Sequence, residues 1–337
     1  MNVKNPVVFF TISIFFLLLF SACTPKKREG ESIAVFIPGQ RAGSAIYSLL
    51  AEGAERAVRE QRGAEIIVVE AGYNQTEWEQ QLTMLAASGK HSLIVSSNPS
   101  MPYFVSAISE KFPAQRFLLL DAELAGNPNV YTLRYNQREQ AYMAGFLAAL
   151  LSENTRSIGL LAAQEYPVMN NVIKPAYLEG ANAAAEEAGA AAPFALDFRF
   201  IGNWFDAQKA AELANSMIHD GVKVILTIAG SANEGAVRAA QEGGAHILWF
   251  DSNGYAVRPG VIAGSFALAQ DHAVYDKLKL YFAGALPFGT AETAGVRDGY
   301  VRFIDDDPIY IETVPPEIRE RQKRMVERIK TGELALD

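Results

Sequence analysis

Two aspartates and a tryptophan are the side chains in this sequence whose positions favour binding chemistry. Asp121 follows the apolar run Phe117–Leu120, and Asp251 follows His246–Phe250. A carboxylate after a buried strand can accept hydrogen bonds from a ligand, or it can cap the next turn or helix. Trp204 lies in a loop before an alanine-rich segment, where its ring can stack on a planar ligand or cover a helix start. The pattern favours recognition of a small molecule.

Enzyme motifs are absent from the sequence. The four histidines are isolated, so no HExxH-type metal pair is present, and no G-x-S-x-G nucleophile motif occurs. Gly243–Gly244 lacks the Lys-Ser/Thr that follows a phosphate loop. The acidic run Asp305–Asp307 precedes a proline and is typical of a solvated turn. We therefore expect a protein that is not an enzyme and that carries no cofactor and no metal.

The composition indicates a large globular protein. Half of the residues (50%) are apolar, which permits a core large enough for two domains. A net charge of −8 with scattered basic residues argues against a nucleic-acid partner, because a polyanion requires a concentrated basic face. A single cysteine excludes a disulfide framework.

The N-terminal region is typical of a bacterial lipoprotein. Lys4 precedes the apolar run Val7–Phe20, and two small residues then lead to Cys23, the only cysteine. We expect residues 1–22 to be a cleaved signal peptide and Cys23 to carry a diacylglycerol thioether, with a second acyl chain such as palmitate on the new N-terminus. Residues 23–31 would form a charged tether, so that the protein is anchored to the cell membrane and faces the periplasm or exterior. An uncleaved transmembrane anchor is the alternative.

Short apolar runs alternate with amphipathic segments in the rest of the chain, which is the pattern of β-α-β units. Most of these runs are continuous Val/Ile/Leu stretches, as expected for parallel strands covered on both faces. Strands are expected at Ser32–Ile37, Ala64–Val69, Ser92–Ser96, Arg116–Leu120, Val130–Leu133, Ser157–Ala162, Ala195–Phe200, Val222–Ile228 and His246–Phe250. Helices are expected at Ala45–Gln61, Glu77–Ala87, Tyr103–Glu110, Arg138–Leu151, Ile173–Ala188, Ala207–Asp220, Glu234–Glu242, Asp271–Ala283 and Arg319–Lys330.

These elements are too numerous for one open sheet and predict two α/β lobes, each a doubly wound parallel sheet. The first lobe would comprise residues 31–133 and 265–290, and the second 134–264 and 291–337. Several chain crossings between the lobes would form a multi-strand hinge. Ligands of parallel sheets lie beyond the carboxyl ends of the strands, so we expect a ligand cleft between the lobes.

Several segments carry a family resemblance. They are residues 117–121 (FLLLD), 136–145 (NQREQAYMAG), 206–209 (DAQK), 220–225 (DGVKVI), 228–235 (IAGSANEG) and 249–251 (WFD). With these segments the chain resembles the basic membrane protein family of ABC-transporter substrate-binding lipoproteins, which includes purine nucleoside receptors. The resemblance implies a type I periplasmic binding protein fold and an ABC permease and ATPase as partners. It also implies that Asp251 holds ribose-type hydroxyls, Asp121 reaches the ring edge, and Trp204 stacks on the ring.

The chain departs from the nucleoside-binding pattern of this family at two places. Ala45-Ile46-Tyr47 stands where nucleoside receptors have a Ser-Phe-Asn-like signature, and Leu268 replaces a family lysine. Buried hydrogen-bonding groups decide recognition, so these losses favour a different substrate. A flat ring with a polyhydroxyl tail fits what remains. Riboflavin is therefore expected first, because the chain also resembles the spirochaetal riboflavin-binding lipoproteins, and a purine nucleoside second.

The expected ligand site combines two aromatic rings with the polar groups at the strand ends. Tyr47 is as readily a core residue as a ligand contact. Lobe closure around the ligand would precede docking on the permease; a lipoprotein sensor or adhesin of the same fold is the alternative. The full expected set is Tyr47, Asn98, Asp121, Gln137, Trp204, Gly230, Asn233, Asp251, Asn253 and Gln270.

Overall fold

The computed structural model describes residues 30–152, 154–190 and 192–336. The predicted signal peptide, the lipidation site Cys23 and most of the predicted tether lie outside these residues. Within the described part of the chain, no helix has both the length and the apolar character needed to cross a bilayer.

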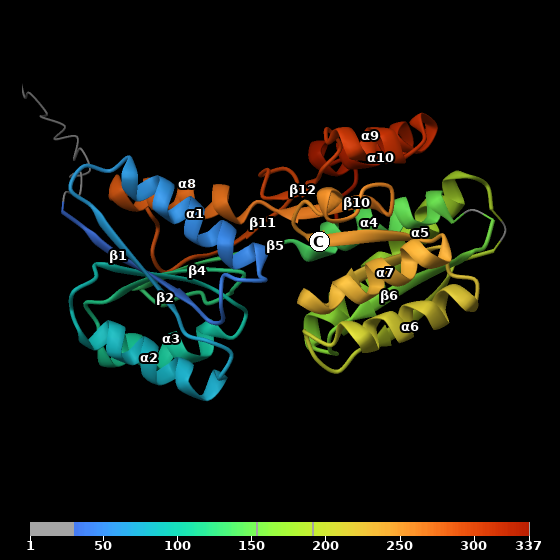
Figure 1. Cartoon of the computed structure of the whole chain (residues 1–337). Coiled ribbons are helices and arrows are strands. Elements are labelled where there is room, and N and C mark those ends of the chain that lie inside the picture. The colour runs from blue at the N-terminus through green and yellow to red at the C-terminus, as the bar shows by residue number, and fades with distance from the viewer. Residues whose placement is uncertain (1–29, 153, 191, 337) are drawn as a thin grey trace, which may run out of the picture.

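The first lobe is built on a six-stranded parallel sheet in the order β11-β5-β4-β3-β1-β2. Helices α1 and α8 pack together on one face, and α2 and α3 lie on the other (Figure 1). The strands are β1 Ser32–Ile37, β2 Glu65–Glu70, β3 Leu93–Ser97, β4 Arg116–Leu120, β5 Val130–Tyr135 and β11 Ala291–Ala294. The helices are α1 Ala45–Arg59, α2 Gln75–Ala87, α3 Met101–Lys111 and α8 Gln270–Phe282.

The second lobe repeats this plan with the order β12-β10-β9-β8-β6-β7. Only the short edge strand β12 runs antiparallel to its neighbour. The strands are β6 Ser157–Ala162, β7 Ala195–Phe200, β8 Val224–Ile228, β9 His246–Asp251, β10 Ile262–Leu268 and β12 Val301–Phe303. The helices are α4 Gln137–Leu151, α5 Lys174–Glu187, α6 Ala207–His219 and α7 Asn233–Gly243, with a π-helical turn at Met169–Ile173 before α5.

The two sheet orders correspond strand for strand. β1 and β6, β3 and β8, and β4 and β9 hold the same places in their sheets. The prediction of two doubly wound lobes is therefore confirmed. Its physical basis is visible in β3 and β8, whose residues are all buried, because helices cover both faces of each sheet.

Side-chain caps fix where several helices begin. The Asn136 side chain accepts a hydrogen bond from the Glu139 backbone N–H at the start of α4, and Asp206 accepts one from the Lys209 N–H at the start of α6. Each cap satisfies a donor that the first helical turn leaves unpaired. Asn136 directly follows the end of β5, so this cap starts α4 immediately after its strand.

Three chain segments join the lobes, between β5 and α4, between β10 and α8, and between β11 and β12. The crossings lie a few residues from the predicted boundaries. β5 extends to Tyr135, residues 265–268 belong to the second sheet, and β11 pairs with β5 in the first sheet rather than opening the second lobe. Strand pairing decides these positions. The sequences of β10, β11 and β12 were too short or too mixed to predict as strands.

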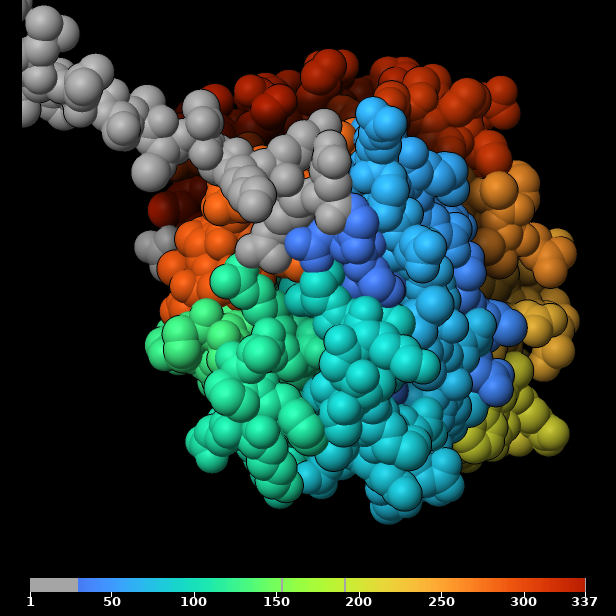
Figure 2. Space-filling view, turned by 90° about the vertical axis from the view of Figure 1, so that its left-hand side faces the viewer, coloured from blue at the N-terminus to red at the C-terminus, as the bar shows by residue number. Residues whose placement is uncertain are grey.

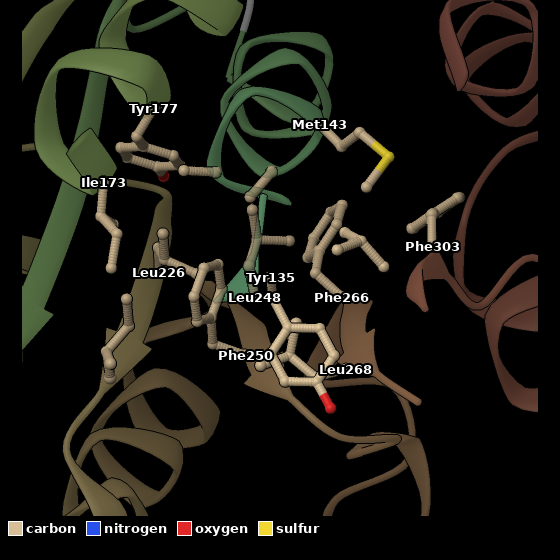
Figure 3. Close-up of a cluster of buried hydrophobic side chains, with 14 of the residues drawn as sticks. Tyr135, Met143, Ile173, Tyr177, Leu226, Leu248, Phe250, Phe266, Leu268 and Phe303 are labelled. Carbon is tan, nitrogen blue, oxygen red and sulfur yellow. The ribbon is translucent and has the colours of Figure 1, made fainter. Parts of the chain in front are cut away.

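The second lobe has a dense core beneath α4 and α5 (Figure 3). Phe266 and Phe303 stack with ring centroids 5.0 Å apart. A Cβ on Gly145 of α4 would collide with the backbone carbonyl of Tyr177, and one on Gly180 of α5 with that of Tyr142. The two helices therefore touch through their backbones.

The C-terminal helices α9 Pro308–Thr313 and α10 Pro316–Thr331 lie over the second lobe, where α10 packs on α4. Figure 2 views the molecule from the first lobe, with the C-terminal helices along the top edge. The Asn136 side-chain amide donates to the Leu336 carbonyl at 2.9 Å, which ties the chain end to the hinge.

Candidate functional site

Asp121 and Asp251 occupy equivalent positions in the two lobes. Each follows or ends the corresponding strand, β4 or β9, and each has a left-handed backbone, with φ of 50° and 69°. Among the described residues other than glycine, Arg156 alone shares a positive φ. This conformation is costly for side chains other than glycine and is often found at functional sites. The fold thus places one aspartate at the same strand end of each lobe.

The Asp251 carboxylate acts electrostatically on Asp121 across the lobes. Burial, and after it the charge of Asp251, raises the pKa of Asp121 to about 7. Burial also raises the pKa of Asp251 to about 6, and a hydrogen bond from Gln140 acts in the opposite direction. Both side chains remain partly accessible. Two largely desolvated acceptors that lie close enough to interact favour a ligand that brings hydrogen-bond donors to both.

Tyr47 and Asn98 form the aromatic and amide part of the site in the first lobe. The Asn98 amide donates to the Tyr47 hydroxyl at 3.3 Å, and the Asn98 side-chain oxygen accepts from the Ser100 N–H at 2.8 Å. The Tyr47 ring packs on Gly39, where a Cβ would lie 2.9 Å from the ring. Burial raises the pKa of Tyr47 to about 12 and Asp121 contributes to that shift, so the phenol lies near the first-lobe carboxylate.

Trp204 is paired with Tyr166, a residue that the sequence analysis missed. Trp204 is 43% exposed, and its ring centroid lies 6.4 Å from that of half-buried Tyr166 at an angle of 39°. Burial raises the pKa of Tyr166, and both Asp251 and Asp121 add to the increase, so the phenol lies near both carboxylates. Tyr166 lies in a loop between β6 and the π-helical turn, where sequence periodicity gives no signal.

Gly230 supports Trp204. A Cβ on Gly230 would lie 3.0 Å from the Trp204 carbonyl oxygen, and that oxygen accepts hydrogen bonds from the Ser231 hydroxyl and the Ala232 N–H. Gln137, the first residue of α4, is half-buried beside the hinge.

Three of the expected amides make hydrogen bonds within the protein. Gln270 is fully buried: its oxygen accepts from Ser97 and Tyr135, and its nitrogen donates to the Ile46 carbonyl. Asn233 accepts from the Thr227 hydroxyl and the Ala229 N–H. The amide of exposed Asn253 donates to Asp307 and its oxygen accepts from the Tyr255 N–H. These contacts occupy the side-chain oxygen of each amide, and that the three amides line the ligand site stays a prediction.

Gln140 is a second residue that the sequence analysis missed. It lies on α4 and is fully buried, and its amide nitrogen donates to Asp251 at 3.2 Å and to the Phe266 carbonyl at 2.8 Å. Gln140 lies inside a predicted helix, so the sequence gave no sign that its role differs from that of the neighbouring core residues.

No group of three or more His, Cys, Asp or Glu side chains within the described ranges is arranged to hold a metal ion. The polar groups gathered around the two aspartates are instead suited to hydrogen bonding of an organic ligand.

A family model described as "ABC transporter substrate-binding protein PnrA-like" (Bmp) matches residues 30–335. The chain belongs to the Bmp family. This match confirms the resemblance found in the sequence, and it makes the chain a substrate-binding component of an ABC transporter rather than an enzyme. The family also implies a small-molecule ligand and an ABC permease and ATPase as partners.

Relatives with curated names agree with the family match. An uncharacterized lipoprotein of Pyrococcus abyssi is 26% identical over 88% of this chain and 77% of its own length. Basic membrane protein A1 of Borrelia garinii is 23% identical over 86% of both chains. The ABC transporter nucleoside-binding protein BmpA of Lactococcus lactis is 24% identical over 45% of this chain and 41% of its own length.

Solved structures confirm the fold. A solute-binding protein of an Aeropyrum pernix ABC transporter has a TM-score of 0.76 at 21% identity, covering 90% of this chain and 92% of that one. A solute-binding protein from Conexibacter woesei has a TM-score of 0.68 at 21% identity, covering 91% and 98%. The expected periplasmic-binding-protein architecture is therefore confirmed.

The raised pKa of Asp121 predicts a pH-dependent effect of Asp121→Asn on the ligand-free protein. The folded pKa of about 7 exceeds the unfolded value, so the stability from this bound proton is full below about pH 4 and is lost as the pH rises through 7. We expect the variant to melt roughly 2–4 °C above the wild type near pH 8 and to lose this advantage near pH 4.5. Calorimetry at both pH values measures the difference, and an equal offset at both would contradict the assignment.

Proposed function

We propose that the chain binds riboflavin between its lobes and delivers it to an ABC importer, with a purine nucleoside as the alternative ligand. The observation that carries this proposal is the pair of carboxylates at equivalent strand ends beside the Trp204–Tyr166 pair. Carboxylates accept hydrogen bonds from an imide N–H and from hydroxyl groups, and the rings offer a surface to a flat heterocycle. Riboflavin presents all three features.

The number of candidate aromatic rings favours the larger ring. Tyr166 and Trp204 come from the loops after β6 and β7, and Tyr47 comes from the other lobe. Offset stacking adds about 0.5–1.5 kcal/mol for each well-placed ring beyond the area buried. The nucleoside alternative is supported by the relative named as nucleoside-binding and by Asp121 and Asp251, which the family resemblance assigns to nucleoside contacts.

The charge of the site favours a neutral ligand. Within the described chain, the side chain that shifts the pKa of Asp121 is Asp251, and the one that shifts the pKa of Asp251 is Gln140. Neither shift involves a lysine or an arginine. A phosphate would therefore meet two acidic groups without a counter-charge, which costs several kcal/mol in a desolvated site. The phosphorylated form of the vitamin is expected to bind at least ~100-fold more weakly than riboflavin itself.

The proposed location follows from the N-terminal sequence and from the relatives. Residues 1–22 would direct export, Cys23 would carry the lipid, and the folded chain would face the periplasm or exterior. Relatives in Pyrococcus are named lipoproteins. Lobe closure would bring the contacts of both lobes to the ligand, and the closed form would dock on the permease.

The absorption spectrum of residues 24–337 purified from flavin-containing bacteria tests the proposal. We expect a yellow protein with flavin bands that releases riboflavin on denaturation. A colourless protein that releases a purine nucleoside on denaturation would show that the nucleoside, and not riboflavin, is the ligand. A protein that holds neither, and binds neither when each is added in titration calorimetry, would contradict both and favour a sensor or adhesin.

A further inference from the structure

The buried amide of Gln140 connects the end of α4's first turn to two neighbouring strands. Its side-chain nitrogen donates to the Asp251 carboxylate, 3.2 Å away, and to the Phe266 carbonyl, 2.8 Å away. β9 and β10 pair in parallel there, with Asp251 opposite Ala267. One primary amide has two N–H donors, so both are used and their directions are fixed by acceptors on two strands.

The two acceptors also determine the orientation of the amide, that is, which position its nitrogen and its oxygen occupy. A reversed amide would place its oxygen against the Phe266 carbonyl and the Asp251 carboxylate, which are both acceptors. Gln140 is fully buried, and α4, which carries it, starts at a crossing between the lobes. The amide therefore has one orientation, and a rigid element holds it.

We propose that Gln140 is a positioning residue for ligand binding, whose buried amide holds the Asp251 carboxylate in its binding orientation at the end of β9. The inference rests on the proposed ligand role of Asp251. A donor hydrogen bond also favours the ionised carboxylate, which accepts from ligand hydroxyls through both oxygens.

The other titratable groups that face Asp251 cannot replace this contact. Asp121, from the first lobe, is coupled to Asp251 as a like charge. Tyr166, from the loop after β6, has a pKa raised by burial and then by both aspartates, and its interaction with Asp251 is electrostatic rather than a hydrogen bond. Gln140 is the group that lowers the pKa of Asp251 among the described residues. Its removal should therefore raise that pKa.

The experiment compares Gln140→Leu with Gln322→Leu. Gln322 is an equally buried glutamine on α10. Its amide donates at 3.0 Å to the carbonyl of Met143, which lies on α4 like Gln140. Neither glutamine oxygen has a hydrogen-bond partner in the structure, so the two changes remove similar groups from similar surroundings. Only Gln140 touches Asp251, which makes Gln322→Leu the matched control.

The readout is the pKa of Asp251, measured by carbon-13 NMR on the ligand-free protein and assigned with Asp251→Asn. We expect Gln140→Leu to raise the pKa of Asp251 by about 1, because the free energy of a hydrogen bond to a charged group corresponds to a change of that size. Gln322→Leu should leave this pKa unchanged. Riboflavin or adenosine, whichever the wild type binds, should bind about 10-fold more weakly to Gln140→Leu near pH 7, with a larger loss near pH 6.

The outcomes separate this inference from the proposed function. A wild-type protein that binds neither riboflavin nor adenosine would contradict the proposed function, while the NMR titration would still decide whether Gln140 acts on Asp251. An unchanged Asp251 pKa, or an equal shift in Gln322→Leu, would overturn the inference. If Gln140→Leu does not fold, Gln140→Met provides the same test, because it keeps the length of the side chain and removes both N–H donors without adding a charge.

Discussion

Asp251→Ala is expected to weaken riboflavin binding by about 100-fold or more while the ligand-free protein still folds. Hydrogen bonds to an ionised carboxylate contribute about 1.5–3 kcal/mol each, and loss of two of them amounts to a factor of ~100 or more in the dissociation constant. Burial already makes the charged form of this side chain costly, as its raised pKa shows. Removing the carboxylate relieves this cost but leaves one buried Gln140 N–H without its acceptor, so the two effects offset and thermal unfolding should change little. Titration calorimetry and a thermal melt measure the two effects.

The matched control for Asp251→Ala is Asp220→Ala. Asp220 belongs to the same lobe and pairs with Arg199 at 2.8 Å on an exposed surface. Exposed ion pairs contribute little to stability, so neither binding nor melting should change by much. Asp251 would be a structural residue if Asp251→Ala bound the ligand with unchanged affinity. The same would follow if the variant lost affinity and its melting temperature fell as well.

Gly145→Val is expected to prevent correct folding of the second lobe. A Cβ at Gly145 collides with the Tyr177 backbone carbonyl, and Gly180 makes the reciprocal contact with Tyr142. A backbone carbonyl cannot move aside as a flexible side chain can, so α4 and α5 would have to separate. Their shared core would open with them (Figure 3). Overpacking of this kind costs about 3 kcal/mol or more.

The measurement for Gly145→Val is calorimetric unfolding together with the soluble yield. We expect either insoluble protein or a melting temperature lower by roughly 10 °C. Ala188→Val, at the exposed C-terminal end of α5, adds a branched side chain without a collision and should melt near the wild-type temperature. A Gly145→Val protein that melts with the wild type would show that the two helices tolerate a wider spacing.

The repeating elements were predictable because their signal is local. Four predicted strands, including Ser32–Ile37 and Ser157–Ala162, have the observed bounds, since continuous apolar runs mark strands that are covered on both faces. β10, β11 and β12 were missed as strands. Ala291–Ala294, for example, has one buried residue in four and carries a glutamate, so its sequence gives no pattern to detect.

The candidate site was predictable only in part. Asp121 and Asp251 stood out because a polar residue directly after an apolar run marks a strand end. Gln270 follows a strand end in the same way, but the structure surrounds its amide with Ser97, Tyr135 and the Ile46 carbonyl. The sequence indicates that such a residue lies at a strand end. The partners of its side chain come from segments distant in the sequence, so the sequence does not predict them.

The sequence alone determined the two-lobe α/β plan, the family and the strand ends that carry the aspartates, because hydrophobic periodicity and short motifs are written in consecutive residues. The tertiary structure decided which side chains meet at those ends. Tyr166 and Gln140 reach the aspartates from a loop and from a helix on the same lobe, and Asp121 is coupled to Asp251 from the other. Such contacts depend on the packing of elements distant in sequence, and no local pattern records them.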